Sequence, residues 1–302
     1  MSLDTTMPFR RREALAAGIT QHALGSGKYR QLLRGVYVGH GTKVDGYVEA
    51  RAALLASHRS AFVSHHTAAR LYRAVVPHSE KLHVSVPRGA PRAHRGDLLV
   101  HASSRSPVVF RGLRVTSARD TFLDLAARLN LLDLVVLGDS LVRRDRTTPE
   151  QLVRAAAAAE GRGSRLARRA AGLVRADVDS PMETRCRMLR VLSGLPELET
   201  DVRFFDDDGN LVRRLDAADR STRLAVEYDG RHHVERQEQW EADIGRREEF
   251  EDEEWRIVTL VSKDVYTTPG ATVERLRRSF RQRGIAVGRP LQEWRRYFPE
   301  RT

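Results

Sequence analysis

The sequence predicts an α/β protein of several domains: an N-terminal winged helix-turn-helix in residues 1–58, an α/β middle domain in residues 59–175, and a C-terminal αβββαβ domain in residues 178–285. Three patterns predict this division. Two short helical segments precede a basic hairpin, helices and strands are mixed in the middle, and three strand-like segments follow a capped helix near the end. With 302 residues, the chain is long enough for two or three domains that each bury a core.

Charge is unevenly distributed along the chain. Residues 1–177 contain 29 Lys and Arg against 14 Asp and Glu, which gives a net charge of +15. Residues 178–302 contain 23 against 26, which gives −3 and completes the total of +12. The first part is therefore the part that DNA, a polyanion, attracts. Only four of the 52 basic residues are lysine, so a compositional bias toward arginine is the alternative explanation.

Cysteine content and hydropathy predict a cytoplasmic protein with no membrane partner. The one cysteine, Cys186, cannot form an intrachain disulfide, and a zinc site built from several cysteines is excluded. No N-terminal segment combines a basic start, a long apolar run and a small-residue cleavage site. The most apolar stretch, Leu131–Val142, is too short to span a bilayer and contains Asp133 and Asp139.

The first domain is predicted from two short helices and a hairpin. Phe9–Ala17 has helical apolar spacing, and Thr20 caps a second helix that ends at Gly25. Strand-forming residues follow in Tyr29–Val38 around the turn-compatible pair Arg34-Gly35. In a winged helix-turn-helix, the second helix enters the major groove of DNA and the hairpin touches phosphates. A small helical cap with a solvated basic face is the alternative interpretation.

Eight side chains of this segment are candidates for DNA binding. Six are basic and suit contacts to the phosphate backbone: Arg10, Arg11, Arg12, Lys28, Arg30 and Arg34. Gln21 and His22 lie early in the second helix, where they can reach base edges.

Several motifs between residues 8 and 175 resemble the AbiEi-type antitoxin family of abortive-infection systems. In chain order they are EALAAGIT, YRQLLRGVYV, FVSHHTAARLYR, LHVSVPRG, LRVTSARDTFLDLA and VVLGDSLVRR. The resemblance implies a DNA-binding winged helix that autoregulates transcription, followed by a second domain. It also implies a partner, a nucleotidyltransferase toxin encoded nearby. The chain is longer than a plain antitoxin of this family.

The middle domain is predicted to mix helices and strands. Ser64 is placed to cap a helix, Leu82–Val86 alternates like a half-buried strand, and Thr116–Leu129 is helical. Thr148 opens an Ala-rich helix through a capping box. Seven of the eleven histidines lie between residues 58 and 101, but their spacings fit no metal template, so we expect scattered histidines. The segment Gly161–Asp179, rich in Gly, Arg and Ala, is the predicted linker, and we expect it to be partly helical.

The C-terminal domain begins with a helix that Ser180 caps, with Pro181 in its first turn, Glu183 at its third position and an end near Leu192. The further elements are predicted as strands over Glu199–Phe205, Leu211–Ala218 and Arg223–Asp229, a helix over Gln237–Phe250, a strand over Arg256–Val261 and a helix over Thr272–Arg281. This order is the core of the restriction-endonuclease-like PD-(D/E)XK fold.

The second and third of these strands are expected to bring three carboxylates together. A two-residue turn at 221–222 pairs Asp219 with Leu224, Ala218 with Ala225, Ala217 with Val226, and Asp216 with Glu227. Directly opposed residues share one face of the sheet, and Asp229 points to the same side because it lies two residues beyond Glu227. Three carboxylates at the end of mostly apolar strands require a cation, and oxygen ligands suit Mg²⁺ or Mn²⁺. Such an ion activates water and stabilises negative charge in phosphodiester cleavage.

The segments VRRLDAAD, LAVEYDGRHH and EADIGRREEFEDEEWRIVTLV resemble a nuclease-like family related to the very-short-patch repair endonucleases. The resemblance covers about residues 180–283 and implies a metal-dependent DNA endonuclease or nickase in which Asp216 and Glu227 bind the metal. Asp229 stands where the usual motif has lysine, so His232 or His233 is the candidate general base.

Two further matches complete the candidate site that the resemblance implies. Glu183 matches an acidic residue on the first helix, and Asp243 and Arg246 match a helix motif that supports the site or holds phosphate. The candidate catalytic residues are therefore Asp216, Glu227, Asp229, His232, His233 and Glu183, of which Asp216, Glu227 and Asp229 are the candidate metal ligands.

Each candidate also has a structural explanation. Glu183 can complete a capping box with Ser180, and Asp229-Gly230 can form a turn. His232 and His233 can be exposed loop residues, and Asp243 and Arg246 can form a surface ion pair. The acidic run Glu248–Glu254 is expected to be a solvated face.

Two functions stay open. One is a DNA endonuclease that its N-terminal half delivers to DNA. The other is a non-enzymatic regulator or antitoxin of a type IV toxin–antitoxin system, with an inactive nuclease fold.

Overall fold

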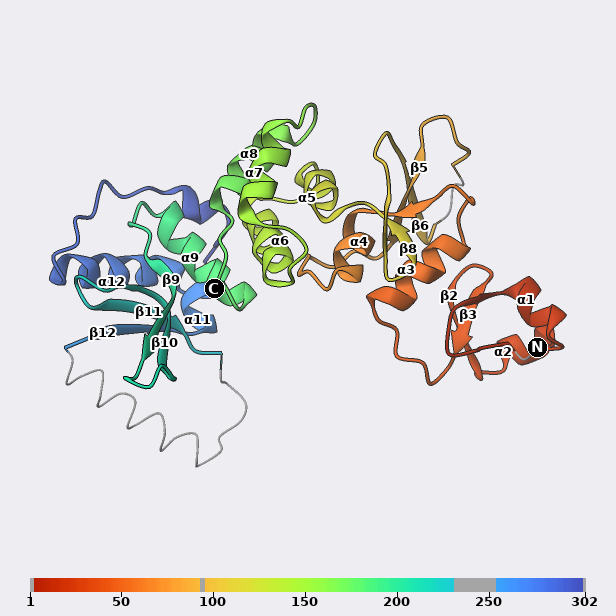
Figure 1. Ribbon diagram of the computed structural model, residues 1–302, viewed down its shortest axis with the longest axis horizontal. Helices are drawn as coiled ribbons and strands as arrows, with labels where there is room; N and C mark the ends of the chain where they lie inside the picture. The colour runs from red at the N-terminus through yellow and green to blue at the C-terminus, as the bar shows by residue number, and fades with distance from the viewer. Residues whose placement is uncertain (1–2, 93–95, 231–253, 301–302) are drawn as a thin grey trace. The chain divides into compact units, whose positions relative to one another are not determined.

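The computed structural model describes residues 3–92, 96–230 and 254–300, which form a mixed α/β structure with three β-sheets (Figure 1). The chain divides into two compact units, Met1–Arg175 and Ala176–Thr302. No helix among the described residues combines the length and apolar character that a membrane crossing requires.

The first unit starts with two short helices and a small antiparallel sheet of order β1-β3-β2. Its elements are β1 (Phe9–Arg10), α1 (Arg11–Ala16), α2 (Gln21–Gly25), β2 (Tyr29–Leu33) and β3 (Val36–Gly39). Thr20 caps α2 as predicted, because its Oγ1 accepts a hydrogen bond of 3.1 Å from Ala23 N. Gly35 turns the β2–β3 hairpin with a φ of +77°, a left-handed conformation that glycine adopts without strain. Phe9, Leu24 and Tyr37 pack in the core of this part.

A five-stranded sheet of order β6-β5-β4-β8-β7 follows. The elements are α3 (Gly46–Leu55), β4 (Phe62–Val63), α4 (His65–Leu71), β5 (Leu82–Pro87), β6 (Leu98–Ser103), β7 (Val108–Phe110) and β8 (Leu113–Val115). Strand β5 was expected to be half-buried, but His83–Val86 are all buried. The reason is its place in the sheet: β5 lies between β4 and β6, and both α3 and α4 pack against it.

Four helices complete the first unit: α5 (Ala118–Ala126), α6 (Leu131–Arg143), α7 (Pro149–Ala157) and α8 (Ser164–Leu173). They pack against one another. The segment Gly161–Asp179, predicted as a partly helical linker, contains helix α8, and the division between the two compact units falls within it. Ala167, Ala170 and Ala171 are buried at helical spacing, and these small side chains let α8 approach α6 and α7 closely.

The second unit contains a four-stranded sheet of order β12-β11-β10-β9. Its elements are α9 (Pro181–Leu192), β9 (Glu199–Phe205), β10 (Leu211–Asp219), β11 (Leu224–Tyr228), β12 (Arg256–Leu260), α11 (Ser262–Tyr266), α12 (Pro269–Gln282) and the 3₁₀ helix η1 (Glu293–Arg296). Strands β9, β10 and β11 are antiparallel neighbours, and β12 runs parallel to β11. The helix predicted over Gln237–Phe250 lies outside the described residues.

The register of the β10–β11 hairpin is as predicted over three pairs. They are Asp219 with Leu224, Ala218 with Ala225, and Ala217 with Val226. The ladder stops there, and the expected fourth pair, Asp216 with Glu227, is not a ladder pair. Instead, the Asp216 carboxylate Oδ2 accepts a hydrogen bond of 2.8 Å from the backbone N–H of Tyr228.

Candidate functional site

A small pocket lies between helix α9 and the sheet of the second unit. Its volume is about 20 Å³, enough for one water molecule or one ion. Glu183 reaches it from α9, Asp216 from β10 and Tyr228 from β11. The remaining lining residues are Val178, Cys186, Arg187, Arg190, Thr200, Ala217 and Val226. The structure therefore brings together Glu183 and Asp216, which are 33 residues apart in the chain.

Helix capping positions Glu183. Ser180 Oγ accepts a hydrogen bond of 3.1 Å from Glu183 N, and Glu183 Oε2 accepts one of 2.9 Å from Asp179 N. This reciprocal pattern fixes the first turn of α9 as a capping box does, although the side chain returns to Asp179 rather than to the N-cap Ser180. The structural and functional interpretations of Glu183 are thus compatible.

The two carboxylates influence each other. Burial raises the pKa of Glu183 above its usual value, and the negative charge of Asp216 raises it further. Two acidic groups that repel each other at one small pocket favour the binding of a cation.

Two buried arginines of α9 line the same pocket. Arg187 is 3% exposed, and its Nη1 lies 3.8 Å from Glu197 Oε1. Arg190 is 2% exposed, and burial lowers its pKa to about 10. Positive charge is therefore already present beside Glu183 and Asp216.

The other residues predicted for this site lie elsewhere or are not described. Glu227 and Asp229 are partly exposed and do not line the pocket, and Asp229 N donates to Leu260 O at 2.8 Å. His232, His233, Asp243 and Arg246 lie outside the described residues. Within the described part of the chain, the three residues whose ligand atoms all lie within 4.8 Å of one another are a different set, His65, His83 and His101.

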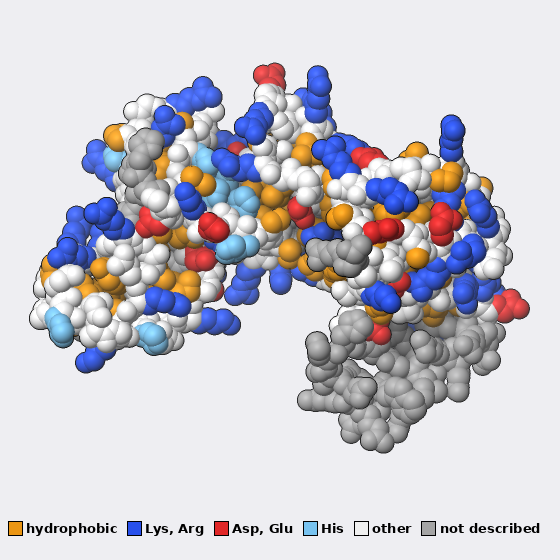
Figure 2. Space-filling view, turned by 180° about the vertical axis from the view of Figure 1, so that it is seen from behind, with side chains coloured by type: hydrophobic (Ala, Val, Ile, Leu, Met, Phe, Trp, Pro, Cys, Tyr) orange, Lys and Arg blue, Asp and Glu red, His pale blue; other side chains and the backbone are white. Residues whose placement is uncertain are grey.

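Seven of the eight candidate DNA-binding side chains are exposed: Arg11, Arg12, Gln21, His22, Lys28, Arg30 and Arg34. Arg10 is half-buried, and its Nε donates a hydrogen bond of 2.8 Å to Leu55 O. Lys and Arg side chains are spread over the face drawn in Figure 2 rather than gathered in one patch.

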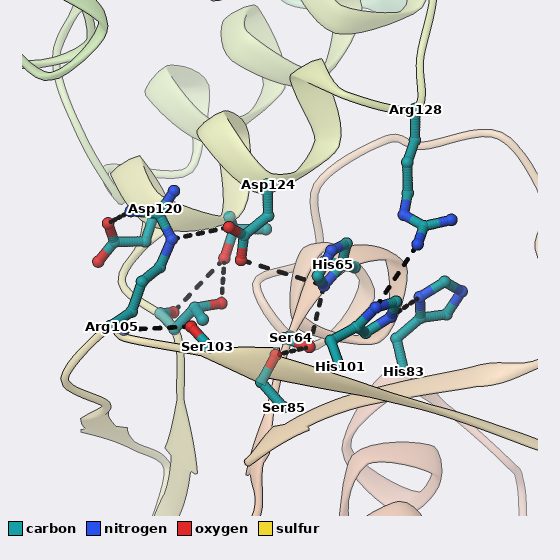
Figure 3. Close-up of polar contacts among 12 residues, drawn as sticks. Ser64, His65, His83, Ser85, His101, Ser103, Arg105, Asp120, Asp124 and Arg128 are labelled. Atoms are coloured by element: carbon teal, nitrogen blue, oxygen red, sulfur yellow. Dashed lines mark hydrogen bonds and ion pairs between the residues drawn. The ribbon is translucent and has the colours of Figure 1, made fainter. Parts of the chain in front are cut away.

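The histidines of the first unit form a cluster, which corrects the expectation that they are scattered. His65 is the first residue of α4, His83 lies on β5 and His101 lies on β6 (Figure 3). In the parallel β5–β6 pair, His101 lies opposite Ser85, two residues from His83, so both histidines project from one face. The sequence spacing could not reveal this cluster because it depends on which strands become neighbours.

A chain of hydrogen bonds connects two of these rings to their surroundings. His83 Nδ1 lies 3.1 Å from His101 Nε2, and His83 Nε2 lies 3.0 Å from Ser79 Oγ. Ser79 Oγ donates to Lys81 O, and Arg128 Nη2 lies 3.5 Å from His101 Nδ1. All four contacts are satisfied if each imidazole is neutral and donates one hydrogen.

His65 has its own polar partners. Its Nδ1 lies 3.0 Å from Ser64 Oγ and 4.0 Å from Asp124 Oδ2. The sequence predicted that the Ser64 side chain caps α4, but it does not. Its Oγ accepts a hydrogen bond of 2.8 Å from Ser85 Oγ instead. His65 has a φ of 51°, an unusual conformation for a residue other than glycine. Such strained backbone is found at functional sites more often than elsewhere.

The rings of His65 and His83 are buried, that of His101 is half-buried, and all three are uncharged at neutral pH. His65 is 9% exposed and His83 is 2% exposed. Burial is the main cause that lowers the pKa of His65 to about 2, of His83 to about 3 and of His101 to about 4. The ring of the adjacent His66 packs against His83 with 4.8 Å between ring centroids, and burial lowers the pKa of His66 to about 4.

A larger pocket of about 560 Å³ adjoins this cluster through Asp124. Arg105 forms ion pairs with both Asp120 and Asp124 at the wall of this pocket (Figure 3).

The sequence matches no protein-family model and no curated protein.

Proposed function

We propose that this chain is a DNA-binding protein whose second unit hydrolyses phosphodiester bonds of DNA with a bound Mg²⁺ or Mn²⁺. In this proposal the first unit delivers the protein to DNA, and the second carries a PD-(D/E)XK-type endonuclease or nickase site. The observation that carries the proposal is the meeting of Glu183 and Asp216 at a pocket the size of one ion.

The order of elements in the second unit supports a nuclease fold. Helix α9 precedes three antiparallel strands, and β12 then joins the sheet parallel to β11. These elements agree with an αβββαβ order, whose second helix, predicted over Gln237–Phe250, lies outside the described residues. Asp216 lies on the second strand where its pairing with the third ends, so its side chain is not confined by the ladder.

The residues present fit a hard divalent cation. Glu183 and Asp216 offer carboxylate oxygens, the donors that Mg²⁺ and Mn²⁺ prefer. We assign the metal to these two residues, with Glu227 and Asp229 at the adjacent end of β11 as further acidic groups. A bound ion would supply activation of water and neutralisation of charge on the phosphate. The chain's own contribution is to hold the two carboxylates in place through α9 capping and the Tyr228 N–H.

Exposed basic side chains support DNA binding by the first unit. Arg11 and Arg12 begin α1, and Lys28 and Arg30 lie at the start of the hairpin. We propose that this segment acts as a winged helix-turn-helix in which Gln21 and His22 of the exposed helix α2 read bases. The resemblance to AbiEi-type antitoxins adds a nucleotidyltransferase toxin as a proposed partner.

A second function is favoured by the buried arginines. Arg187 and Arg190 line the pocket of Glu183 and Asp216, and guanidinium groups can neutralise carboxylates without a metal. In that case the second unit is an inactive nuclease fold, and the protein is a non-enzymatic transcriptional regulator or antitoxin.

Nicking of supercoiled plasmid distinguishes the two functions. We expect the full chain to nick or linearise plasmid with Mg²⁺ or Mn²⁺, and EDTA to stop the reaction. Asp216→Asn abolishes cleavage, whereas the matched control Asp208→Asn, an exposed loop carboxylate of the same unit, retains it. Cleavage that survives Asp216→Asn would overturn the site. A protein that binds DNA and cleaves no substrate with either ion would establish the regulator instead.

A further inference from the structure

We infer that His65, His83 and His101 form a zinc site in the first unit, separate from the carboxylate pocket of the second. One ring nitrogen of each histidine lies within 4.8 Å of one ring nitrogen of each of the others. His101 is half-buried, so an ion from solution can reach the cluster at this ring. The site is independent of the proposed nuclease function.

The contact between His83 and His101 carries the inference. The 3.1 Å between His83 Nδ1 and His101 Nε2 is close to the separation of two imidazole nitrogens on one tetrahedral zinc. With Zn–N bonds of about 2.0–2.1 Å, that separation is about 3.3 Å. An ion can therefore replace the hydrogen that the two rings share with a change of a few tenths of an ångström in the distance between the nitrogens, once both rings turn so that their lone pairs point at the ion.

His65 supplies the third nitrogen after a rotation of its ring. Its ring stacks on that of His101, with 3.9 Å between centroids and 21° between planes. A metal ligand directs its lone pair in the plane of its ring, so His65 turns out of this stack when it binds. Asp124 Oδ2 lies 4.0 Å from His65 Nδ1, close enough to balance part of the charge of the ion, and a water molecule can take the fourth position.

The surroundings orient the ligands as metal sites require. His83 Nε2 contacts Ser79 Oγ, and the Ser79 hydroxyl donates a hydrogen bond to Lys81 O. A partner for the second ring nitrogen fixes the tautomer that leaves Nδ1 free for a metal. Ser64 and Ser85 hold His65 in the same way.

The donor set selects the metal. Neutral imidazoles suit zinc and other late first-row metals, whereas Mg²⁺ prefers oxygen ligands. Three histidines with one carboxylate or water is a common zinc arrangement. The proposed magnesium at Glu183 and Asp216 and the zinc at the histidines therefore do not compete for the same site.

Arg128 opposes the ion in the observed arrangement. Its guanidinium lies 3.5 Å from His101 Nδ1, the nitrogen that carries the hydrogen once Nε2 binds zinc. Arg128 is an exposed side chain, so it can turn away, but its charge still repels the ion. Replacement of Arg128 by Met should therefore tighten zinc binding.

Calorimetric titration of the metal-free, untagged full chain with Zn²⁺ tests the site, with Co²⁺ absorption as a probe of tetrahedral nitrogen ligation. We expect one high-affinity equivalent, at least about 100-fold weaker binding in His101→Gln, and tighter binding in Arg128→Met. His66→Gln is the control, because His66 is as buried as its neighbour His65 in α4 but is not in the ligand set, and it should bind zinc like the wild type.

Three outcomes overturn the inference. The wild type binds no zinc, His101→Gln binds zinc as tightly as the wild type, or His66→Gln loses as much zinc affinity as His101→Gln. If His101→Gln does not fold, judged by circular dichroism, Arg128→Met still decides. Tighter binding in that variant supports the site, and unchanged or weaker binding refutes it.

Discussion

Asp216 accepts a hydrogen bond of 2.8 Å from the backbone N–H of Tyr228, at the point where β10 and β11 cease to pair. This bond replaces the next bond of the ladder. It holds the carboxylate at the pocket that Glu183 also lines. Asp216 thus has a structural role and a proposed catalytic role, and substitutions can separate them.

Asp216→Asn retains an oxygen that can accept from Tyr228 N, but it removes the charge. We expect its free energy of unfolding to stay within about 1 kcal/mol of the wild type. Plasmid nicking should fall at least about 100-fold, because a metal ligand contributes several kcal/mol to the transition state. Asp216→Ala also loses the hydrogen bond and should be destabilised by about 1–3 kcal/mol. Urea denaturation and nicking rates check both, and an active Asp216→Asn protein contradicts the assignment.

Glu183→Gln should stabilise the metal-free protein at pH 7. The pKa of Glu183 is raised in the folded protein. Protonation of Glu183 therefore stabilises the fold at pH values below its usual pKa, and this contribution is lost as the pH rises through the raised pKa. At pH 7 the charged carboxylate therefore costs stability, and Gln removes that cost. We expect Tm to rise by about 2 °C, a small value because solvent screens the pair. Mg²⁺ should then raise the Tm of the wild type and not that of Glu183→Gln. A lower Tm for the metal-free variant at pH 7 contradicts this.

Arg10, which ends β1, and Arg12, which lies in the first turn of α1, should behave differently. Arg12 is exposed, so Arg12→Ala should weaken DNA binding at all sequences and reduce the salt slope of log K by about 0.9. Arg10 donates to Leu55 O, so Arg10→Ala should cost about 1 kcal/mol of stability and leave the slope unchanged. Fluorescence anisotropy at several salt concentrations measures the slope. Equal slopes for Arg12→Ala and the wild type would remove Arg12 from the DNA contact.

The hairpin register could be predicted because it depends on local sequence. Alternation with period two and a short turn at 221–222 are enough to place Ala217 opposite Val226. The same reasoning failed one residue later. Asp216 accepts a hydrogen bond from Tyr228 N instead of forming a ladder pair with Glu227. Strands β10 and β11 stop pairing at this point, and the sequence pattern does not show where the pairing ends.

The histidine cluster was not predicted, and helix α8 was expected only as part of a partly helical linker. His65, His83 and His101 meet because β5 and β6 are neighbours in the sheet and α4 packs on β5, and no local pattern encodes those contacts. For helix α8, the Gly and Arg content of the segment suggested a linker, and the packing of the helix was not predicted. Its signal was the spacing of Ala167, Ala170 and Ala171, small side chains that form one apolar face.

Cys186 should be unreactive in the folded protein. It is 5% exposed, and burial raises its pKa to about 12, so almost no thiolate exists at pH 8. We expect an aromatic disulfide reagent to modify it only after unfolding, with one equivalent in guanidinium chloride. Because Cys186 lines the pocket of Glu183 and Asp216, Mg²⁺ should slow any residual reaction of the native protein. Rapid modification of the native protein would contradict the buried position.

The metal-free first unit should lose stability as the pH falls from 6.5. The pKa values of His65, His66, His83 and His101 are depressed to about 2, 4, 3 and 4, so the unfolded chain binds protons that the folded chain does not. Their stabilisation is complete above pH 6.5 and is lost as the pH falls toward 4. Each such histidine contributes up to about 1.4 kcal/mol per pH unit.

Thermal melts in EDTA between pH 7 and pH 5 measure this loss, because ordinary carboxylates do not yet titrate in that window. We expect Tm to fall by about 10 °C or more, because four rings together remove several kcal/mol over this pH range. His66→Gln removes one titrating ring that is not a proposed zinc ligand, so it should reduce the slope of Tm against pH by about a quarter. A flat profile in the wild type would mean that these rings are solvated or already protonated. That result would remove the buried neutral imidazoles on which the zinc site depends.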